Sequence, residues 1–533
     1  MNTPMLRTVG LALLAAAFTP FPARSQSLDL IGVTLLQTLT TNLNGSGIRV
    51  AQPEAPVVST PDTFEINPAN VGLPGSRFTY VNTSGMSATT YPNTVGTNSW
   101  HAERVGNNFY GPSYGVATNL AHVDNYDANY FVNNVIGAAF PASINDAVVN
   151  QSFDTGSVSN SVQEQIDSIF DNYATRFNTL FISGAGDGGP ISPPSTCYNG
   201  IAVACCDGGS SYGPTPDNGR SKPDLTAPGS GAVIPPGQAA TSYSTPYVSG
   251  SATVLLQAAL RGDGGSNPTA AADMRTLKAL LLNGAVKPIG WTNSSSAPLH
   301  AVYGAGIVNV FNSYEEMAGS KHPWIVSNSV VSGALHPPAG ATGTIGTNSG
   351  WDFDSLTSVS NPARDSVTHY YFNLSNAIYT ATATLVWNRQ YHTNNINHLA
   401  LFLYNAANSN LVMESTSMVD NVQHIYLPRL SPGRYDLQVW KAGGSGIVTA
   451  SESYAVAWAF TAPAFKAARS GTNLIFTWPV YPAGYALQGT PNLTAPVWST
   501  NNIPGPNFAT GTNVVTLPYG SGLHFFRLQQ PGS

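Results

Sequence analysis

Charged residues are scarce in this sequence of 533 residues. Only 9% are Asp, Glu, Lys or Arg, whereas about a quarter is typical of soluble domains. Hydrophobic residues make up 42%, which is enough to build packed cores, so the low charge does not indicate disorder. The formal net charge is −6 and no basic cluster occurs. Nucleic acid is therefore not an expected partner, because binding to phosphates requires dense Lys and Arg.

Cysteine is also rare, and the three residues are Cys197, Cys205 and Cys206. This number is small for a secreted domain built on a disulfide framework. Cys197 could bridge one of the adjacent pair and leave the other free, or all three could be buried thiols. The sequence leaves both alternatives open.

Long hydrophobic runs are missing beyond the N-terminus: no later segment has the roughly eighteen consecutive apolar residues that indicate a transmembrane helix. The N-terminus itself resembles a secretory signal, with Arg7, an apolar stretch at residues 9–18 and a small-x-small cleavage site at residues 23–25. We therefore expect a signal peptide over residues 1–25 and a soluble chain exported to the periplasm or the extracellular space. The alternative is an uncleaved membrane anchor.

The chain is too long for one ordinary core, so about two to four domains are expected. Over residues 26–320, segments with strand character alternate with helical ones, which indicates an α/β fold with a parallel sheet and helices on both faces. The clearest helix is predicted from Ser161 to about Asn178, opened by a capping box of Ser161 and Glu164. Residues 55–98 are rich in Pro, Asn and Thr and predict a long loop region.

From about Lys321, short strands separated by Gly, Pro and Asn turns replace the helices. Apolar and polar residues alternate at residues 435–439, as on a half-buried sheet. We expect a β-sandwich accessory domain over residues 321–462 and a small all-β C-terminal module over residues 463–533. Three tryptophans of the sandwich are assigned to its core rather than to a ligand platform: Trp387, Trp440 and Trp458.

The stretch from Gln238 to Leu260 organises the N-terminal domain, and its second half has helical spacing. Pro246 is tolerated because it falls in the first turn. Ser242 therefore stands at a helix N-terminus, where unpaired N–H groups favour negative charge. Ser242 can be a plain N-cap, or it can be a nucleophile whose developing oxyanion is met by those N–H groups.

Three other positions offer chemistry to such a serine. Glu54 follows a predicted strand at its C-terminal end, where open α/β sheets place their sites. His101 lies near the first turn of a helix, and Asp187 lies in the glycine-rich loop 184–189 after another strand. Considered alone, Glu54 would be interpreted as a solvated loop carboxylate and His101 as a structural histidine. The prediction of a shared catalytic site therefore depends on the order of these residues along one domain.

That order resembles the subtilisin-like serine peptidases over about residues 28–320. The segment 45–54 is similar to the family's Gly-x-Gly-Val-x-Val-Ala-Val-Ile strand, which ends in the catalytic Asp, with Glu54 at the acid position. The segment 101–107 is similar to His-Gly-Thr-His-Val-Ala-Gly, and the segment 240–246 is similar to Gly-Thr-Ser-Met-Ala-Thr-Pro.

Two further matches concern the substrate cleft. Gly184-Ala185-Gly186-Asp187 stands where the family has Ala-Ala-Gly-Asn, whose Asn donates a hydrogen bond to the oxyanion. The segment 150–153 resembles the family's Asn-Met-Ser strand along the cleft.

The resemblance implies a secreted serine endopeptidase that hydrolyses peptide bonds of protein or peptide substrates. Ser242 would be the nucleophile, His101 the base, Glu54 the orienting acid and Asp187 part of the oxyanion hole. The chemistry implied requires no cofactor. Calcium sites are common among subtilisin relatives, but no Asp-rich loop locates one in this sequence.

Two departures from the family pattern matter physically. Glu54 is one methylene longer than Asp, and an ionised Asp187 has no proton to donate to an oxyanion. Asp187 would have to be protonated to serve, while His101 must stay neutral, which predicts a narrow optimum at acidic pH, near about pH 5–6. Carboxylates at these places also resemble the acid-acting sedolisins, although those carry Glu where His101 stands.

The main alternative is a catalytically weak or inactive protein that uses a subtilisin scaffold for binding at a surface or in secretion. A third interpretation gives the main role to the C-terminal β-domains, which resemble accessory domains of bacterial secreted peptidases. Such domains could contact a cell surface or a polysaccharide.

Overall fold

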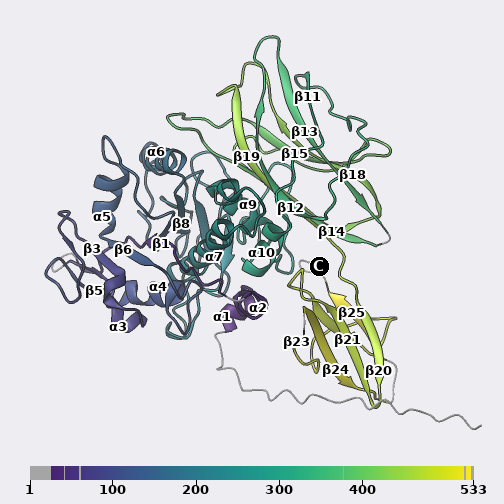
Figure 1. Ribbon diagram of the computed structural model, residues 1–533, viewed down its shortest axis with the longest axis horizontal. Coiled ribbons are helices and arrows are strands. Elements are labelled where there is room, and N and C mark those ends of the chain that lie inside the picture. The colour runs from purple at the N-terminus through teal and green to yellow at the C-terminus, as the bar shows by residue number, and fades with distance from the viewer. Residues whose placement is uncertain are drawn as a thin grey trace, which may run out of the picture.

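The computed structural model describes residues 26–40, 42–58, 62–375, 377–509, 511–520 and 524–529. The proposed signal peptide lies outside these residues. Figure 1 shows an α/β domain on the left, a β-rich region at the upper right and a small β unit at the lower right. No helix of the described residues is both long and apolar enough to cross a membrane.

An eight-stranded sheet forms the centre of the α/β domain, in the order β10-β9-β8-β7-β1-β6-β3-β4. All neighbouring strands are parallel except β3 and β4. The strands are β1 (Arg49–Ala51), β3 (Phe78–Val81), β4 (Ser87–Ala88), β6 (His122–Tyr126), β7 (Val148–Gln151), β8 (Leu180–Gly184), β9 (Ile201–Cys205) and β10 (Leu225–Ala227). The predicted α/β fold is confirmed.

Helix α7 (Thr241–Arg261) packs against β7, β8 and β9 and is buried along most of its length. Its buried hydroxyl groups are satisfied one turn back: Ser251 donates to Tyr247 O and Thr253 to Ser249 O, each at 2.8 Å. The other helices are α1 (Gln26–Leu30), α2 (Val33–Leu39), α3 (Pro68–Val71), α4 (Trp100–Tyr110), α5 (Ala128–Tyr130), α6 (Asn160–Phe177), α8 (Pro268–Ala271), α9 (Met274–Asn283) and α10 (Val310–Ala318).

Two expectations about this domain were wrong in detail. Residues 55–98 contain β3 and β4 of the main sheet and a second pair, β2 (Thr63–Glu65) with β5 (Thr97–Asn98). Each of these strands has only two to four residues, too few to show a period in the sequence.

The predicted capping box is also absent from α6: Glu164 pairs with Arg389 at 2.7 Å instead of turning back to the helix start.

The β-rich region is a sandwich of two antiparallel sheets, ordered β11-β13-β18-β15-β16 and β12-β19-β14-β17. Trp387 and Trp458 are fully buried between the sheets, as predicted, whereas Trp440 is half-buried outside that core against the rings of His336 and His398. The strands are β11 (Val326–Val331), β12 (Ser349–Thr357), β13 (Arg364–Leu374), β14 (Tyr379–Trp387), β15 (Leu399–Asn405), β16 (Asn410–Ser415), β17 (Val422–Leu430), β18 (Gly433–Lys441) and β19 (Ser451–Thr461).

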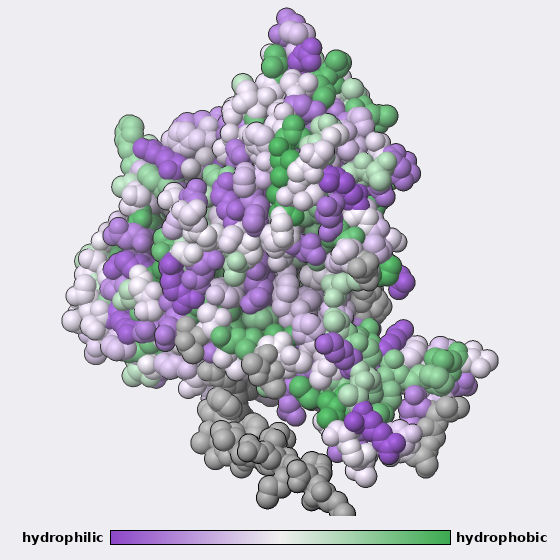
Figure 2. All heavy atoms as spheres, turned by 45° about the vertical axis from the view of Figure 1, so that its right-hand side comes forward, coloured by the Kyte–Doolittle hydropathy of each residue, from purple (hydrophilic) through white to green (hydrophobic). Residues whose placement is uncertain are grey.

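The C-terminal unit has a four-stranded sheet, β20-β21-β24-β23, and a two-stranded sheet, β22-β25. Its small core centres on Phe476 and Trp478. The strands are β20 (Lys466–Ser470), β21 (Asn473–Pro479), β22 (Ala486–Thr490), β23 (Asn507–Ala509), β24 (Thr512–Pro518) and β25 (Phe525–Gln529). On the face in Figure 2, apolar residues lie in small groups among polar ones, including on the lobe at the lower right.

Arg389, in the loop after β14, ties the sandwich to the α/β domain. Its guanidinium is 1% exposed and contacts Asp171 at 2.8 Å and Glu164 at 2.7 Å, both on α6. Its backbone N–H donates to Asn199 Oδ1 at 2.8 Å. The two domains therefore share a buried ionic contact rather than a flexible junction.

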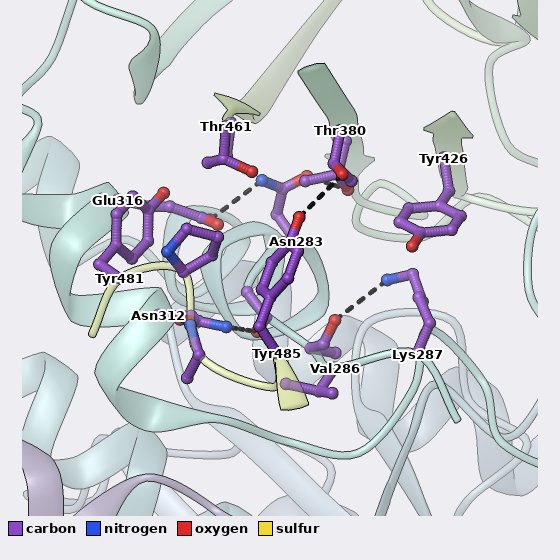
Figure 3. Close-up of a pocket in the computed structure, with 16 residues that line it drawn as sticks. Asn283, Val286, Lys287, Asn312, Glu316, Thr380, Tyr426, Thr461, Tyr481 and Tyr485 are labelled. Carbon is purple, nitrogen blue, oxygen red and sulfur yellow. Dashed lines mark hydrogen bonds between the residues drawn. The ribbon is translucent and has the colours of Figure 1, made fainter. Parts of the chain in front are cut away.

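A cavity of about 50 Å³ lies where the α/β domain, the sandwich and the C-terminal unit meet (Figure 3). Lys287 is buried on one wall, where its Nζ donates to Ala285 O at 3.2 Å and lies 5.3 Å from the centre of the Tyr426 ring. Glu316 is buried on the other wall and accepts a hydrogen bond from Asn283 at 3.0 Å. Burial lowers the pKa of Lys287 to about 7 and raises the pKa of Glu316 to about 8.

This cavity generates a prediction about stability. Because the folded protein disfavours the charged form of Lys287, the lysine destabilises the fold at pH values below about 7, and this penalty fades as the pH rises toward 10.5. Lys287→Met should therefore raise the free energy of unfolding by about 1–4 kcal/mol at pH 6, and the melting temperature should rise with it. The gain should shrink at pH 9. Thermal unfolding at both pH values measures it, and a gain that grows with pH would contradict the assigned cause.

Candidate active site

Glu54 lies at the carboxyl edge of the main sheet, just after the end of β1. Its backbone N–H donates to Tyr126 O at 2.9 Å, so the chain still runs beside β6 at this point. The side chain is 1% exposed. This is the position at the end of a strand that the sequence predicts, but Glu54 is buried rather than solvated.

His101 is the second residue of α4, at the helix start that the sequence predicts. The N-cap residue Ser99 accepts a hydrogen bond from Ala102 N at 3.2 Å and so fixes the first turn. Nδ1 of His101 lies 2.9 Å from Glu54 Oε2, and the imidazole is 18% exposed. Since the carboxylate accepts, Nδ1 carries the proton and Nε2 is left as the basic nitrogen.

Ser242 is the second residue of α7, so its N–H is one of the first-turn groups that no helical carbonyl can accept. Its hydroxyl is half-buried and donates to Ser152 O at 3.3 Å, while Ser152 Oγ donates to Ser242 O at 2.8 Å. The next residue, Tyr243, places its ring 5.9 Å from that of His101. Ser242 and His101 thus lie on the facing N-terminal ends of two packed helices, α7 and α4.

Asp187 lies in the loop after β8, beside the start of α7. Its Oδ1 accepts two hydrogen bonds from Thr241, from the backbone N–H at 2.8 Å and from the hydroxyl at 2.9 Å. Among the described residues, Oδ2 has no hydrogen-bond partner. Gly186 permits this loop, because its φ is +100° and a Cβ there would lie 2.7 Å from Ser211 Oγ.

The pKa of His101 is raised above its ordinary value of 6.5. Burial is the largest single influence and lowers the pKa, but the charge and hydrogen bond of Glu54, together with the charge of Asp187, outweigh it. Arg104 acts in the opposite direction to the two carboxylates.

Sequence reasoning does not single out Gln52 and Tyr110, which also belong to this site. Gln52 donates to Glu54 Oε1 at 2.8 Å, and Tyr110 donates to Gln52 Oε1 at 2.7 Å. The spacing of Gln52 and Glu54 places both on one face of an extended segment, and a polar residue in an apolar strand was the available signal. No pattern in the sequence connects Tyr110, 58 residues further on, to Gln52.

The three cysteines are all free, with Cys197 and Cys205 buried, so no disulfide joins them. Burial raises the pKa of Cys197 to about 12. Within the described residues, no group of three or more His, Cys, Asp or Glu side chains is arranged to hold a metal ion.

Residues 81–306 match the sequence model of the Subtilase family, Peptidase_S8; this span includes His101, Asp187 and Ser242 and begins after Glu54. Comparison with curated proteins finds no match.

Similar solved structures include the serine protease of Aeromonas sobria, at 12% identity over 92% of this chain and 89% of that chain, with a TM-score of 0.37. Another is the CspB protease of Clostridium perfringens, at 13% identity over 55% of this chain and 98% of that chain, with a TM-score of 0.40. These similarities are too weak to carry an argument about activity.

An α/β domain that presents a serine at one helix start and a histidine–carboxylate pair at the facing helix has the parts of a serine hydrolase. The match of residues 81–306 to the Subtilase family points to the same class of hydrolase. This match covers less than half of the chain and supports a subtilisin-like serine peptidase domain, which is a hydrolase.

The cause assigned to the pKa of His101 can be tested directly. Glu54→Gln keeps the size of the side chain but removes its charge, so burial should dominate and the pKa of His101 should fall below 6.5. Titration of the His101 imidazole by NMR measures this change. Asp124→Asn is the matched control, because Asp124 faces His122 at 3.3 Å, and it should leave His101 unchanged. A pKa that stays raised in Glu54→Gln would contradict the assignment.

Proposed function

We propose that this chain is a secreted serine endopeptidase that cleaves protein or peptide substrates through Ser242, His101 and Glu54. The observation that carries the proposal is the 2.9 Å contact between Glu54 and His101 Nδ1, buried beside the helix start that bears Ser242. Such a contact fixes the imidazole with its basic nitrogen free for the serine hydroxyl. Export rests on the N-terminal signal pattern of the sequence.

The chemistry is acyl transfer. His101 Nε2 takes the proton of Ser242 as Oγ attacks the scissile carbonyl, and it then gives this proton to the leaving amine. Glu54 stabilises the imidazolium that forms in between. The hydroxyl of Ser242 leaves Ser152 O and turns toward Nε2 by rotation about its Cα–Cβ bond; hydrogen bonds between catalytic groups often tighten only when substrate is bound.

The backbone N–H of Ser242 is one donor to the oxyanion, and we assign the second to Asp187. The Thr241 contacts turn Oδ1 of Asp187 toward the helix, which leaves Oδ2 for a substrate. A proton on Oδ2 would make it a donor, whereas an ionised carboxylate would repel the developing charge.

A second candidate function is a binding protein on an inactive scaffold. It is favoured by one observation, that the Ser242 hydroxyl contacts Ser152 O and not His101 in this structure. A fluorophosphonate probe separates the two functions, because it reacts only with an activated serine. We expect labelling of the full-length wild type, and at least about a hundredfold slower labelling in Ser242→Ala and His101→Ala. Folded wild-type protein that is not labelled would establish the binding protein instead.

The role of Asp187 predicts a gain of function. In Asp187→Asn, Oδ1 of the amide can still accept from Thr241, and Nδ2 replaces Oδ2 as a donor at every pH. Hydrolysis of a chromogenic peptide at pH 7–8 should rise by about tenfold or more relative to wild type. The acid limb should also move to lower pH, because Asp187 no longer raises the pKa of His101.

The control for this variant is Asp154→Asn, which neutralises another carboxylate close to Gly186 but away from Thr241. Its pH–rate profile should match the wild type. An Asp187→Asn variant without a gain would refute the oxyanion role.

A further inference from the structure

The amide of Gln52 is surrounded by three groups of the candidate active site. Nε2 donates to Glu54 Oε1 at 2.8 Å and to Ala102 O at 3.1 Å, and Oε1 accepts from Tyr110 Oη at 2.7 Å. Gln52 and Tyr110 are completely buried. Both N–H groups of the Gln52 amide and one lone pair of its oxygen are therefore used within this network.

These contacts fix which end of the amide faces Glu54. Rotating the amide by a half turn would place its oxygen against the carboxylate and against Ala102 O, so that two acceptor pairs would meet. Tyr110 adds support to the observed orientation, because its hydroxyl donates to Oε1. Burial, and next the charge of Glu54, raise the pKa of Tyr110 well above 10, which keeps that hydroxyl protonated.

The network also connects the strand end with both ends of α4. Ala102 follows His101 in the first turn of α4, and Tyr110 is its last residue. The backbone of Gln52 is fixed as well, since its N–H donates to Asp124 O and its carbonyl accepts from Asn125 at 3.0 Å. The side chain that contacts Glu54 thus starts from a rigid strand and ends on the helix that carries the imidazole.

We propose that Gln52, oriented by Tyr110, is the positioning residue for the orienting acid of this peptidase. By occupying Oε1, it leaves Oε2 of Glu54 directed at His101 Nδ1. A Glu side chain has one more rotatable bond than Asp, and the second contact removes the freedom that this bond adds. The proposal rests on the proposed function, because positioning matters only where His101 acts as the base.

A buried amide could also be present only because the fold needs its polar groups satisfied. A positioning role and a purely structural role of Gln52 differ in their coupling to Glu54. If Gln52 acts through Glu54, replacing Gln52 should lower kcat only slightly once Glu54 has been replaced. If Gln52 serves the fold alone, the two losses should multiply.

The test uses the full-length chain with Gln52→Leu, Tyr110→Phe and each of these combined with Glu54→Ala. Tyr110→Phe keeps the shape of the core should Gln52→Leu unfold. The matched control is Tyr80→Phe, which removes another completely buried tyrosine hydroxyl, bonded to Ile66 O at 2.9 Å outside the network. Peptide hydrolysis gives kcat and KM across pH, and NMR gives the pKa of His101.

We expect Gln52→Leu to lower kcat by about 10–100-fold and Tyr110→Phe by less, with KM unchanged. In both variants the acid limb of kcat and the pKa of His101 should move down, since Glu54 faces the imidazole less directly. Asp187 and Arg104, the other charged groups that act on His101, are unchanged in these variants. In the Glu54→Ala background the same substitutions should change kcat less than about threefold.

Two outcomes would overturn the proposal: a Tyr110→Phe variant with the same pH profile and His101 pKa as Tyr80→Phe, or losses that multiply in the Glu54→Ala background. A wild type that hydrolyses no peptide and takes up no fluorophosphonate would reject the proposed function. In that case the NMR titration still decides whether Gln52 directs Glu54 toward His101.

Discussion

The hydrogen bond between Glu54 and His101 is the contact on which the rest of the site depends. It joins the carboxyl end of a central strand to the start of a helix, and it sets a charge next to an imidazole that burial alone would keep neutral. The other residues of the candidate site are arranged around Glu54 and His101. Tyr243, the residue after Ser242 at the start of α7, places its ring 5.9 Å from the imidazole, and Gln52 donates to the other oxygen of the carboxylate.

The two departures from the family pattern differ in how the fold accommodates them. At the acid position, the longer Glu54 is met by a donor from the same strand and by a helix that is bonded to that donor. At Asp187, Thr241 contacts one oxygen only, so nothing among the described residues supplies the other with a partner. The first departure is therefore compensated by contacts within the protein, whereas the second leaves one carboxylate oxygen available to a ligand.

The sequence predicted those parts that local pattern determines. Glu54 and His101 could be placed because a strand end and a helix start have recognisable signals, and the long helix α6 because its apolar residues recur over many turns. The short strands between residues 55 and 98 could not be read, since their pairing depends on neighbours distant in the chain. The same limit applies to Gln52, whose partner Tyr110 is identified only by the fold.

The ionic contact of Arg389 has a consequence for how the domains are connected. Asp171 is almost completely buried and its charge is balanced by a guanidinium that belongs to the sandwich. Cutting the chain before residue 321 would remove this guanidinium and leave the Asp171 carboxylate with the backbone N–H groups of Tyr198 and Asn199. The sandwich thus completes an ion pair of the α/β domain, and separating the two would remove a contact that α6 makes in the full chain.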